Sequence, residues 1–262
     1  MPKIPGFLLL AAALATSAGT PSLSAPASQP KPTIVLVHGA FAETSSWNAV
    51  IGKLNKAGYT TVAAANPLRG VASDAASVSA IIRSIAGPVV LVGHSYGGPV
   101  ITEAANRQSN VKALVYVAGF APDSGESSLT LSSKFPGSTL GDALLAVTLP
   151  DGEEDLYIQP DKFHAQFAAD VSAEDAKLMA ATQRPIAHSA LAEPSGEPSW
   201  KKLPSYAVYG SEDRNIPPAV MSFMAKRAHA VKAVVIEGAS HAVMVSHPGE
   251  IASLIEQAAS AR

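Results

Sequence analysis

The stretch VLVGHSYGGPV, residues 90–100, joins an apolar run to a serine that is held between glycines. The run that ends at Val92 is typical of a buried strand, and the residues after Gly97 have helical spacing. Ser95 therefore lies at a sharp turn between a strand and a helix, where Gly93 and Gly97 leave room for neighbouring backbone. A phosphate-binding loop would contain a lysine here, and this stretch has none. The pattern predicts a nucleophile elbow, which presents a serine hydroxyl clear of surrounding side chains.

From residue 33 onward, short apolar runs alternate with segments of helical period. Parallel strands need a long crossover connection, so this alternation predicts a mostly parallel sheet covered by helices. The predicted strands are residues 33–37, 59–65, 89–92, 111–120, 205–210 and 231–238, and the predicted helices are 47–57, 74–85, 97–107, 217–229 and 248–259.

The alternation is interrupted between about residues 123 and 203. This stretch has scattered Pro, Gly and Ser, two helical segments at 160–168 and 172–182, and no clear strand. Because it lies between two predicted strands, we expect a small helical cap insertion over one end of the sheet. Residues 33–262 then form one α/β domain that includes this cap.

The N-terminus has the pattern of a secretory signal peptide. One lysine precedes the apolar run FLLLAAALA at residues 7–15, which is too short to cross a membrane. Residues 25–27 provide an A-x-A cleavage site, and residues 16–18 are an alternative. We therefore predict a signal peptide over 1–27, a flexible lead-in over 28–32, an exported protein, and no stable membrane insertion after cleavage.

Composition excludes several functional classes. The net charge is −2 and no run of like charges occurs, so a nucleic-acid partner is not expected. The absence of cysteine removes disulfides, thiolate metal sites and a cysteine nucleophile. No metal-binding or dinucleotide-binding motif is present, so the prediction includes no metal and no cofactor. The sequence contains no signal for the oligomeric state.

Four motifs in this order resemble those of the α/β-hydrolase-fold superfamily, and the resemblance extends over nearly all of residues 33–262. The branch it resembles contains single-domain carboxylesterases and cofactor-free haloperoxidases. The resemblance implies a mostly parallel central sheet flanked by helices, and a Ser-Asp-His triad in that chain order. The motifs are HGAFAETSSW (38–47), GHSYGG (93–98), YGSEDRNIPP (209–218) and GASHAVMVSHP (238–248).

Three residues match the triad positions that the resemblance implies. Ser95 is the nucleophile, and His241 of GASHAV is the base, with His247 as its only local alternative. Asp213 matches the acid position in the G-x-x-D-x-x-x-P loop, although some members place the acid where Asp123 stands. A buried carboxylate there would hold the imidazole in the required tautomer.

The resemblance also implies an oxyanion hole, which needs two fixed hydrogen-bond donors. The backbone N–H of Tyr96, after the nucleophile, and that of Ala40, after the first strand, are the predicted donors. Phe41 is the predicted substrate-binding wall beside them. Apolar residues of the insertion are further candidates for the pocket lining: Phe135, Leu144, Leu145, Phe163, Phe167 and Met179.

The predicted function is a serine hydrolase that cleaves small-molecule carboxylic esters through an acyl-enzyme intermediate. A haloperoxidase or perhydrolase that uses the same triad, and a non-catalytic binding scaffold of the same fold, remain alternatives. A serine nucleophile argues against dehalogenase or epoxide hydrolase chemistry, which uses an aspartate. Hydroxynitrile lyases of this fold carry a threonine and a lysine where this chain has Gly39 and Ala242.

Overall fold

The computed structural model describes residues 1–3 and 30–261. The predicted signal peptide, apart from its first three residues, and residues 28 and 29 of the predicted lead-in lie outside the described residues. No helix in the described part of the chain has the length and apolar character needed to cross a membrane.

A six-stranded sheet forms the centre of the described structure, in the order β2-β1-β3-β4-β8-β9. Every neighbouring pair is parallel, so the strands all end at the same edge. The predicted mostly parallel sheet is confirmed, and its strands match the apolar runs closely. They are β1 (Thr33–Val37), β2 (Thr61–Ala64), β3 (Val89–His94), β4 (Val111–Val117), β8 (Ser205–Gly210) and β9 (Lys232–Ile236).

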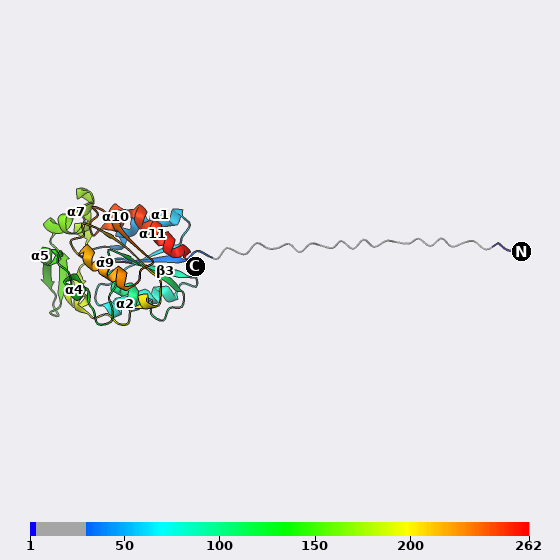
Figure 1. Ribbon diagram of the computed structural model, residues 1–262, viewed down its shortest axis with the longest axis horizontal. Coiled ribbons are helices and arrows are strands. Elements are labelled where there is room, and N and C mark those ends of the chain that lie inside the picture. The colour runs from blue at the N-terminus through cyan, green and yellow to red at the C-terminus, as the bar shows by residue number, and fades with distance from the viewer. Residues whose placement is uncertain (4–29, 262) are drawn as a thin grey trace.

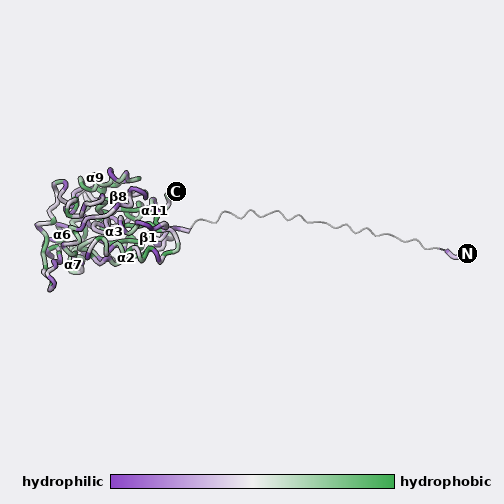
Figure 2. Tube along the Cα trace, turned by 90° about the horizontal axis from the view of Figure 1, so that it is seen from below, coloured by the Kyte–Doolittle hydropathy of each residue, from purple (hydrophilic) through white to green (hydrophobic). Residues whose placement is uncertain are grey.

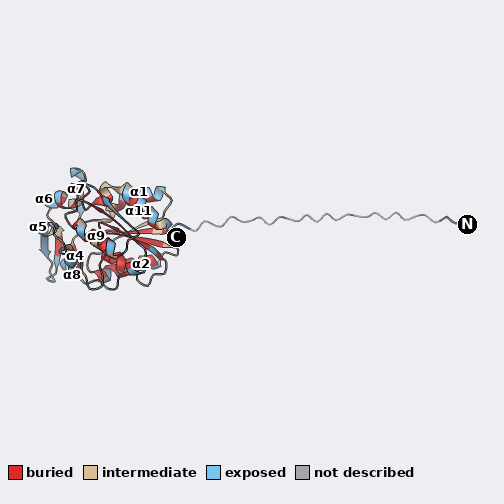
Figure 3. Ribbon diagram, viewed as in Figure 1, coloured by how far each residue is buried: buried red, intermediate tan, exposed pale blue. Residues whose placement is uncertain are grey.

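Helices cover both faces of this sheet, as Figure 1 shows. On one face lie α1 (Asn48–Lys56), α10 (Val243–Ser246) and α11 (Pro248–Ser260), preceded in the chain by the short 3-10 helix η1 (Thr44–Trp47). On the other face, α2 (Val71–Arg83) packs on α3 (Gly97–Ala104), which contacts β1, β3 and β4. Helix α9 (Pro218–Arg227) packs against β8. Figure 3 shows the buried strands between these layers.

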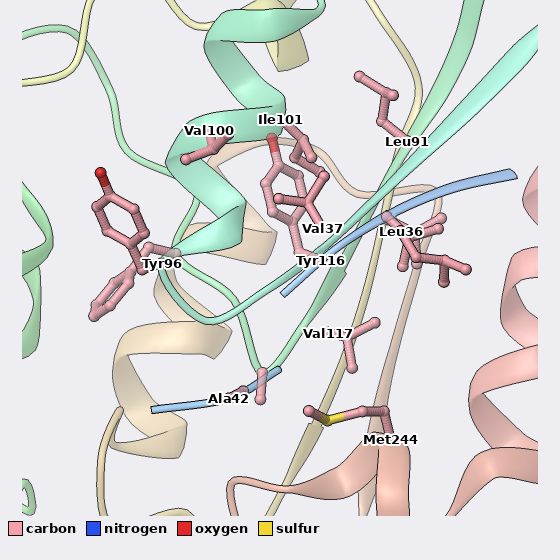
Figure 4. Packing of buried hydrophobic residues seen from close by; sticks show 14 of the residues in the cluster. Leu36, Val37, Ala42, Leu91, Tyr96, Val100, Ile101, Tyr116, Val117 and Met244 are labelled. Atoms are coloured by element: carbon pink, nitrogen blue, oxygen red, sulfur yellow. The ribbon is translucent and has the colours of Figure 1, made fainter. Parts of the chain in front are cut away.

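The core explains why the strand sequences are almost continuously apolar. All six residues of β3 are buried, because helices cover both faces of a parallel sheet. In Figure 4 the side chains of Val100 and Ile101 on α3 lie beside those of Val37 and Tyr116 from the sheet. Burying a side chain of valine or isoleucine size contributes about 1.5–3 kcal/mol to folding. Figure 2 shows hydrophobic segments along the inner strands and hydrophilic ones mostly at the surface.

The insertion between β4 and β8 lies at the end of the molecule opposite the C-terminus (Figure 1). The expectation that it contains no clear strand was wrong, because a three-stranded antiparallel sheet, β5-β6-β7, accompanies its helices. The helices are α4 (Ser128–Ser132), α5 (Leu140–Ala143), α6 (Pro160–Phe167), α7 (Ala173–Thr182) and α8 (His188–Ala192), with the 3-10 helix η2 (Ser199–Lys201); the strands are β5 (Leu144–Thr148), β6 (Glu154–Ile158) and β7 (Ile186–Ala187).

The missed strands had a recognisable turn between them. Residues 150–152 read Pro-Asp-Gly, a turn sequence, and they separate β5 from β6. The strand β5 has the short apolar sequence LLAVT, but most of its residues are exposed, unlike those of the central strands. It is held by pairing with the adjacent β6 rather than by burial in the central core.

Helix α2 begins three residues before the predicted start at Asp74. The carboxylate of Glu193, far along the chain, accepts hydrogen bonds from the backbone N–H groups of Val71 and Ala72 at 2.6 and 3.2 Å. These bonds satisfy free donors of the first helical turn. Because the capping residue comes from the insertion, local sequence could not place this helix start.

Candidate active site

Ser95 occupies a strained turn between β3 and α3. Its φ is +53°, in the left-handed region that non-glycine residues rarely adopt. A Cβ on Gly93 or Gly97 would approach a backbone oxygen to 2.5 Å, so only glycine fits on either side. The strain at Ser95 and the small flanking residues together place its side chain at the carboxyl edge of the sheet, where it lines a cavity.

The loop after β1 lies directly against this turn. A Cβ on Gly39 would come within 2.6 Å of the Ser95 Cβ, so a side chain there would displace the serine. The next residue, Ala40, lines the same cavity as Ser95 and Tyr96. Within the described residues, the backbone N–H groups of Ala40 and Tyr96 donate no hydrogen bond, although both residues are buried. Two unoccupied donors thus adjoin the serine.

Phe41 completes this loop in a fixed conformation. Its φ is +60°, and its N–H donates to the Arg184 carbonyl oxygen at 2.9 Å. The Phe41 ring meets the Phe167 ring edge to face, with centroids 6.4 Å apart. Phe41 lines the cavity at Ser95, and it also lines a second cavity, of about 340 Å³, beside α7.

His241 and Asp213 form a buried pair on the loops that follow β9 and β8. The distance from His241 Nδ1 to Asp213 Oδ2 is 2.6 Å, and both side chains are fully buried. The other carboxylate oxygen of Asp213 accepts from the backbone N–H groups of Asn215 and Ile216 at 2.8 and 2.9 Å. A carboxylate only accepts, so Nδ1 of His241 carries the proton and Nε2 is left as an acceptor.

The Nε2 atom of His241 has no hydrogen-bond partner among the described residues. The Ser95 hydroxyl likewise forms no hydrogen bond there, and the residue borders the cavity. The two residues adjoin through His94, which precedes Ser95 and whose ring centroid is 4.8 Å from that of His241. The site therefore contains a serine hydroxyl and a histidine Nε2 atom, neither of which has a hydrogen-bond partner among the described residues.

His94 is a part of the site whose role the sequence motifs did not indicate. Its Nε2 donates to the His241 carbonyl oxygen at 3.1 Å, which ties the histidine loop to the strand that carries Ser95. Its Nδ1 is buried without a partner. Complete burial, and then the charge of nearby His241, hold the pKa of His94 well below its ordinary value, so the ring is neutral.

The Tyr96 side chain has a role that the motif did not reveal. Its O–H donates to Asp74 Oδ2 at 3.1 Å, and both side chains are buried. Burial raises the pKa of the Asp74 carboxyl. This contact joins α2 to the start of α3, where Figure 4 shows Tyr96, and it holds the backbone that follows Ser95.

The alternative residues weighed from sequence lie elsewhere. Asp123 is partly exposed, and its carboxylate binds Lys201 at 2.8 Å, a pairing that lowers its pKa. His247 contacts Asp170 at 3.4 Å and Glu250 at 3.7 Å, on the outside of the histidine loop. Only Asp213, of the two candidate acids, contacts His241.

A cavity of about 390 Å³ extends from Ser95 beneath the insertion. This volume falls in the range of small-molecule sites. Of the predicted lining residues from the insertion, Phe135 and Leu144 border it. The other four predictions were wrong: Phe163 and Phe167 are buried in the core, Leu145 is 46% exposed, and Met179 borders the second cavity. The residues around the cavity are Ala40, Phe41, Ser95, Tyr96, Phe120, Ser128, Leu129, Ser132, Ser133, Phe135, Pro136, Gly137, Ser138, Leu140, Gly141, Leu144, Leu191, Asn215 and Ile216.

The fold agrees with comparisons to known proteins. Residues 34–254 match the model of the alpha/beta hydrolase family, and the chain belongs to that family. An alpha/beta hydrolase, nvfD, of Aspergillus novofumigatus is 24% identical over an alignment of 253 residues that covers 87% of this chain and 97% of that protein.

Two further relatives are named as esterases. A carbendazim hydrolyzing esterase of a Nocardioides species is 33% identical over 113 residues, covering 38% of this chain and 47% of the relative. The crystal structure of polyneuridine aldehyde esterase superposes with a TM-score of 0.75 at 20% identity, covering 87% of this chain and 99% of the other. At this identity the structural likeness supports the fold.

Proposed function

We propose that this protein is a serine esterase that hydrolyses small-molecule carboxylic esters through an acyl-enzyme. The observation that supports this most strongly is the buried His241–Asp213 pair, 2.6 Å apart, whose Nε2 is unpaired and whose loop is bonded to His94, the residue before the strained Ser95. A histidine held in this tautomer is a base for an adjacent hydroxyl. The esterases among the relatives are consistent with an ester substrate.

In the proposed mechanism, Ser95 Oγ attacks the ester carbonyl carbon while His241 Nε2 takes its proton. Asp213 stabilises the imidazolium that forms and holds the ring in place. The N–H groups of Ala40 and Tyr96 bind the negatively charged oxygen of the tetrahedral intermediate. His241 then gives the proton to the departing alcohol, and a water molecule repeats both steps to release the acid. The contact between Ser95 Oγ and Nε2 forms in the substrate complex, as catalytic hydrogen bonds often tighten on binding.

The experiment is covalent labelling with a fluorophosphonate probe, combined with turnover of p-nitrophenyl esters. The wild type should be labelled and active. Ser95→Ala should abolish labelling and lower kcat by about 10⁴-fold or more, because the nucleophile is lost. Ser253→Ala, at an exposed position of α11, is the matched control and should retain both.

Labelling that persists in Ser95→Ala would contradict the proposal. A wild type that neither labels nor hydrolyses any ester would favour the non-catalytic scaffold instead.

We also propose that the protein is exported. The lysine, the apolar run at 7–15 and the small residues at 25–27 support a cleaved signal peptide. Expression of the full chain in a bacterial host, followed by N-terminal sequencing of the periplasmic and secreted fractions, tests this. We expect a new N-terminus near Ser28, whereas an intact chain retained in the cytoplasm would contradict export.

A further inference from the structure

The cavity at Ser95 has no ionisable side chain among its lining residues apart from the Tyr96 phenol, which bonds Asp74. Most of its other hydroxyl groups are also satisfied within the protein. Ser132 and Ser133 donate to the Leu129 carbonyl oxygen, and Ser138 donates to the Asn215 carbonyl oxygen. Besides Ser95, two lining side chains carry a polar group that has no hydrogen-bond partner among the described residues: Asn215 and Ser128.

The amide orientation of Asn215 follows from its neighbours. One terminal atom of Gln166 lies 3.0 Å from the Arg214 carbonyl oxygen, and because that oxygen only accepts, the atom must be the nitrogen Nε2. The same Nε2 lies 2.8 Å from the side chain of Asn215, which must therefore present its oxygen Oδ1. Thr139 donates to the Gln166 oxygen at 2.8 Å and completes the assignment.

The Asn215 Nδ2 group is consequently turned away from Gln166. Within the described residues it donates no hydrogen bond. Asn215 lines the cavity, and only 2% of its surface is exposed. An amide held in one orientation by Gln166, with both N–H donors unused, is suited to a ligand that accepts hydrogen bonds.

Ser128, at the start of α4, presents a second unused group on the cavity wall. It is 3% exposed, and its Oγ has no hydrogen-bond partner among the described residues. Its neighbour on the wall, Ser132, shows the usual alternative, since that hydroxyl bonds the backbone of its own helix at 2.9 Å. Asn215 and Ser128 come from different elements, the loop after β8 and the insertion.

We propose that Asn215 and Ser128 form an acceptor-binding subsite, so that the preferred substrates are uncharged esters carrying a second neutral hydrogen-bond acceptor. A ketone, ether or additional ester oxygen has this chemistry. The inference rests on the proposed esterase function, which supplies the scissile ester at Ser95. Apart from serine hydroxyls that already bond the protein backbone, the other lining side chains are mostly apolar. The rest of the proposed substrate is therefore hydrocarbon.

The test uses two pairs of esters that differ by one acceptor. On the acyl side, p-nitrophenyl 4-oxopentanoate is compared with p-nitrophenyl pentanoate. On the alcohol side, 2-methoxyethyl pentanoate is compared with butyl pentanoate. Each kcat/KM is divided by the rate constant of that ester with hydroxide, which removes differences in intrinsic reactivity.

We expect the wild type to favour the acceptor ester about 10-fold in at least one pair, the equivalent of one to two hydrogen bonds. Asn215→Leu, which keeps the volume but removes the donors, should reduce this ratio to about one. Ser128→Ala should reduce it about 3-fold. Ser132→Ala removes a hydroxyl that is already bonded, and this matched control should keep the wild-type ratio.

Equal corrected rates for both members of each pair, in a wild type that hydrolyses them, would overturn the subsite and leave the esterase proposal intact. A preference that survives both Asn215→Leu and Ser128→Ala would also overturn it. A wild type that is inactive on all four esters and unlabelled at Ser95 would instead remove the esterase proposal and this inference with it. If Asn215→Leu fails to fold, the wild-type ratios and Ser128→Ala still decide.

Discussion

The carboxyl edge of the central sheet and the insertion above it line one cavity, but their polar groups are satisfied differently. At the sheet edge, Asp213 accepts three hydrogen bonds, from His241 and two backbone N–H groups, and both side chains are buried. In the insertion, cavity serines such as Ser132 bond their own helix, and Ser128 has no partner. Under the proposed function, the sheet edge would be the preorganised catalytic region, whereas the insertion would determine which substrates fit.

The comparison predicts that losing the Asp213–His241 hydrogen bond at the sheet edge lowers activity far more than losing the Asp123–Lys201 ion pair on the surface. In Asp213→Asn, the amide oxygen should keep the two backbone N–H donors, so the amide nitrogen would face His241 Nδ1. The imidazole proton would then move to Nε2, which could no longer accept a proton from Ser95. We expect kcat to fall about 10⁴-fold, measured with p-nitrophenyl esters.

Asp123→Asn is the matched control, since the Asp123 carboxylate bonds a partly exposed Lys201 and the adjacent Ser124 N–H rather than His241. Surface ion pairs of this kind contribute about 0–1 kcal/mol, so this variant should remain within about 2-fold of the wild type. A large loss in Asp123→Asn, with Asp213→Asn active, would reverse the assignment of the two acids.

A second prediction concerns the apolar character of the insertion side. Mono-p-nitrophenyl glutarate has the same chain length as the pentanoate ester but ends in a carboxylate, and no lining residue carries a positive charge. Burying that charge unpaired costs several kcal/mol. At neutral pH we expect kcat/KM for the glutarate ester to be about 100-fold lower. Equal rates would show that the acyl chain does not enter this cavity.

The catalytic side could be predicted from sequence because it is built from local motifs on regular strands. Ser95, Asp213 and His241 each follow an apolar run, and parallel strands bring the ends of such runs to one edge. The resemblance to α/β hydrolases assigned Asp213 and His241 as partners, and the structure pairs these two at 2.6 Å.

The insertion could not be predicted to the same depth, because its contacts join residues far apart in the chain. Of the neighbouring residues Leu144 and Leu145, one borders the cavity and the other faces solvent, a difference set by a strand that the sequence did not reveal. The unused amide of Asn215 depends on Gln166, 49 residues away, and no local pattern marks that bond.

A third prediction uses the buried histidines of the sheet edge. Burial lowers the pKa of His94 and of His38, so both rings are neutral in the folded state at neutral pH. The ring of His241 lies beside that of His94, with centroids 4.8 Å apart. In the unfolded chain His38 and His94 titrate near about pH 6.5, so below that pH the unfolded state binds more protons. Stability is therefore retained at higher pH and lost as the pH falls below about 6.5, with a slope that for each histidine approaches at most about 1.4 kcal/mol per pH unit.

Urea unfolding between about pH 7 and about pH 5 measures this slope. His94→Gln removes the titrating ring while keeping a donor for the His241 carbonyl, and it should remove about 2 kcal/mol of the stability lost between about pH 7 and about pH 5. His188→Gln, on the exposed surface of α8, is the control and should keep the wild-type slope. An unchanged slope in His94→Gln would mean that the ring protonates in the folded state.

The smallest expected effect tests which residues of β5 limit the acyl chain. Leu144→Ala removes carbon atoms from the cavity wall, so longer acyl chains should gain room. Burial of one methylene contributes about 0.8 kcal/mol, so the ratio of kcat/KM for the hexanoate and pentanoate p-nitrophenyl esters should rise about 4-fold. Leu145→Ala makes the same change on the exposed side of the strand and should leave this ratio unaltered. An equal rise in both variants would mean that β5 acts through the stability of the insertion, and the cavity wall would not be what limits chain length.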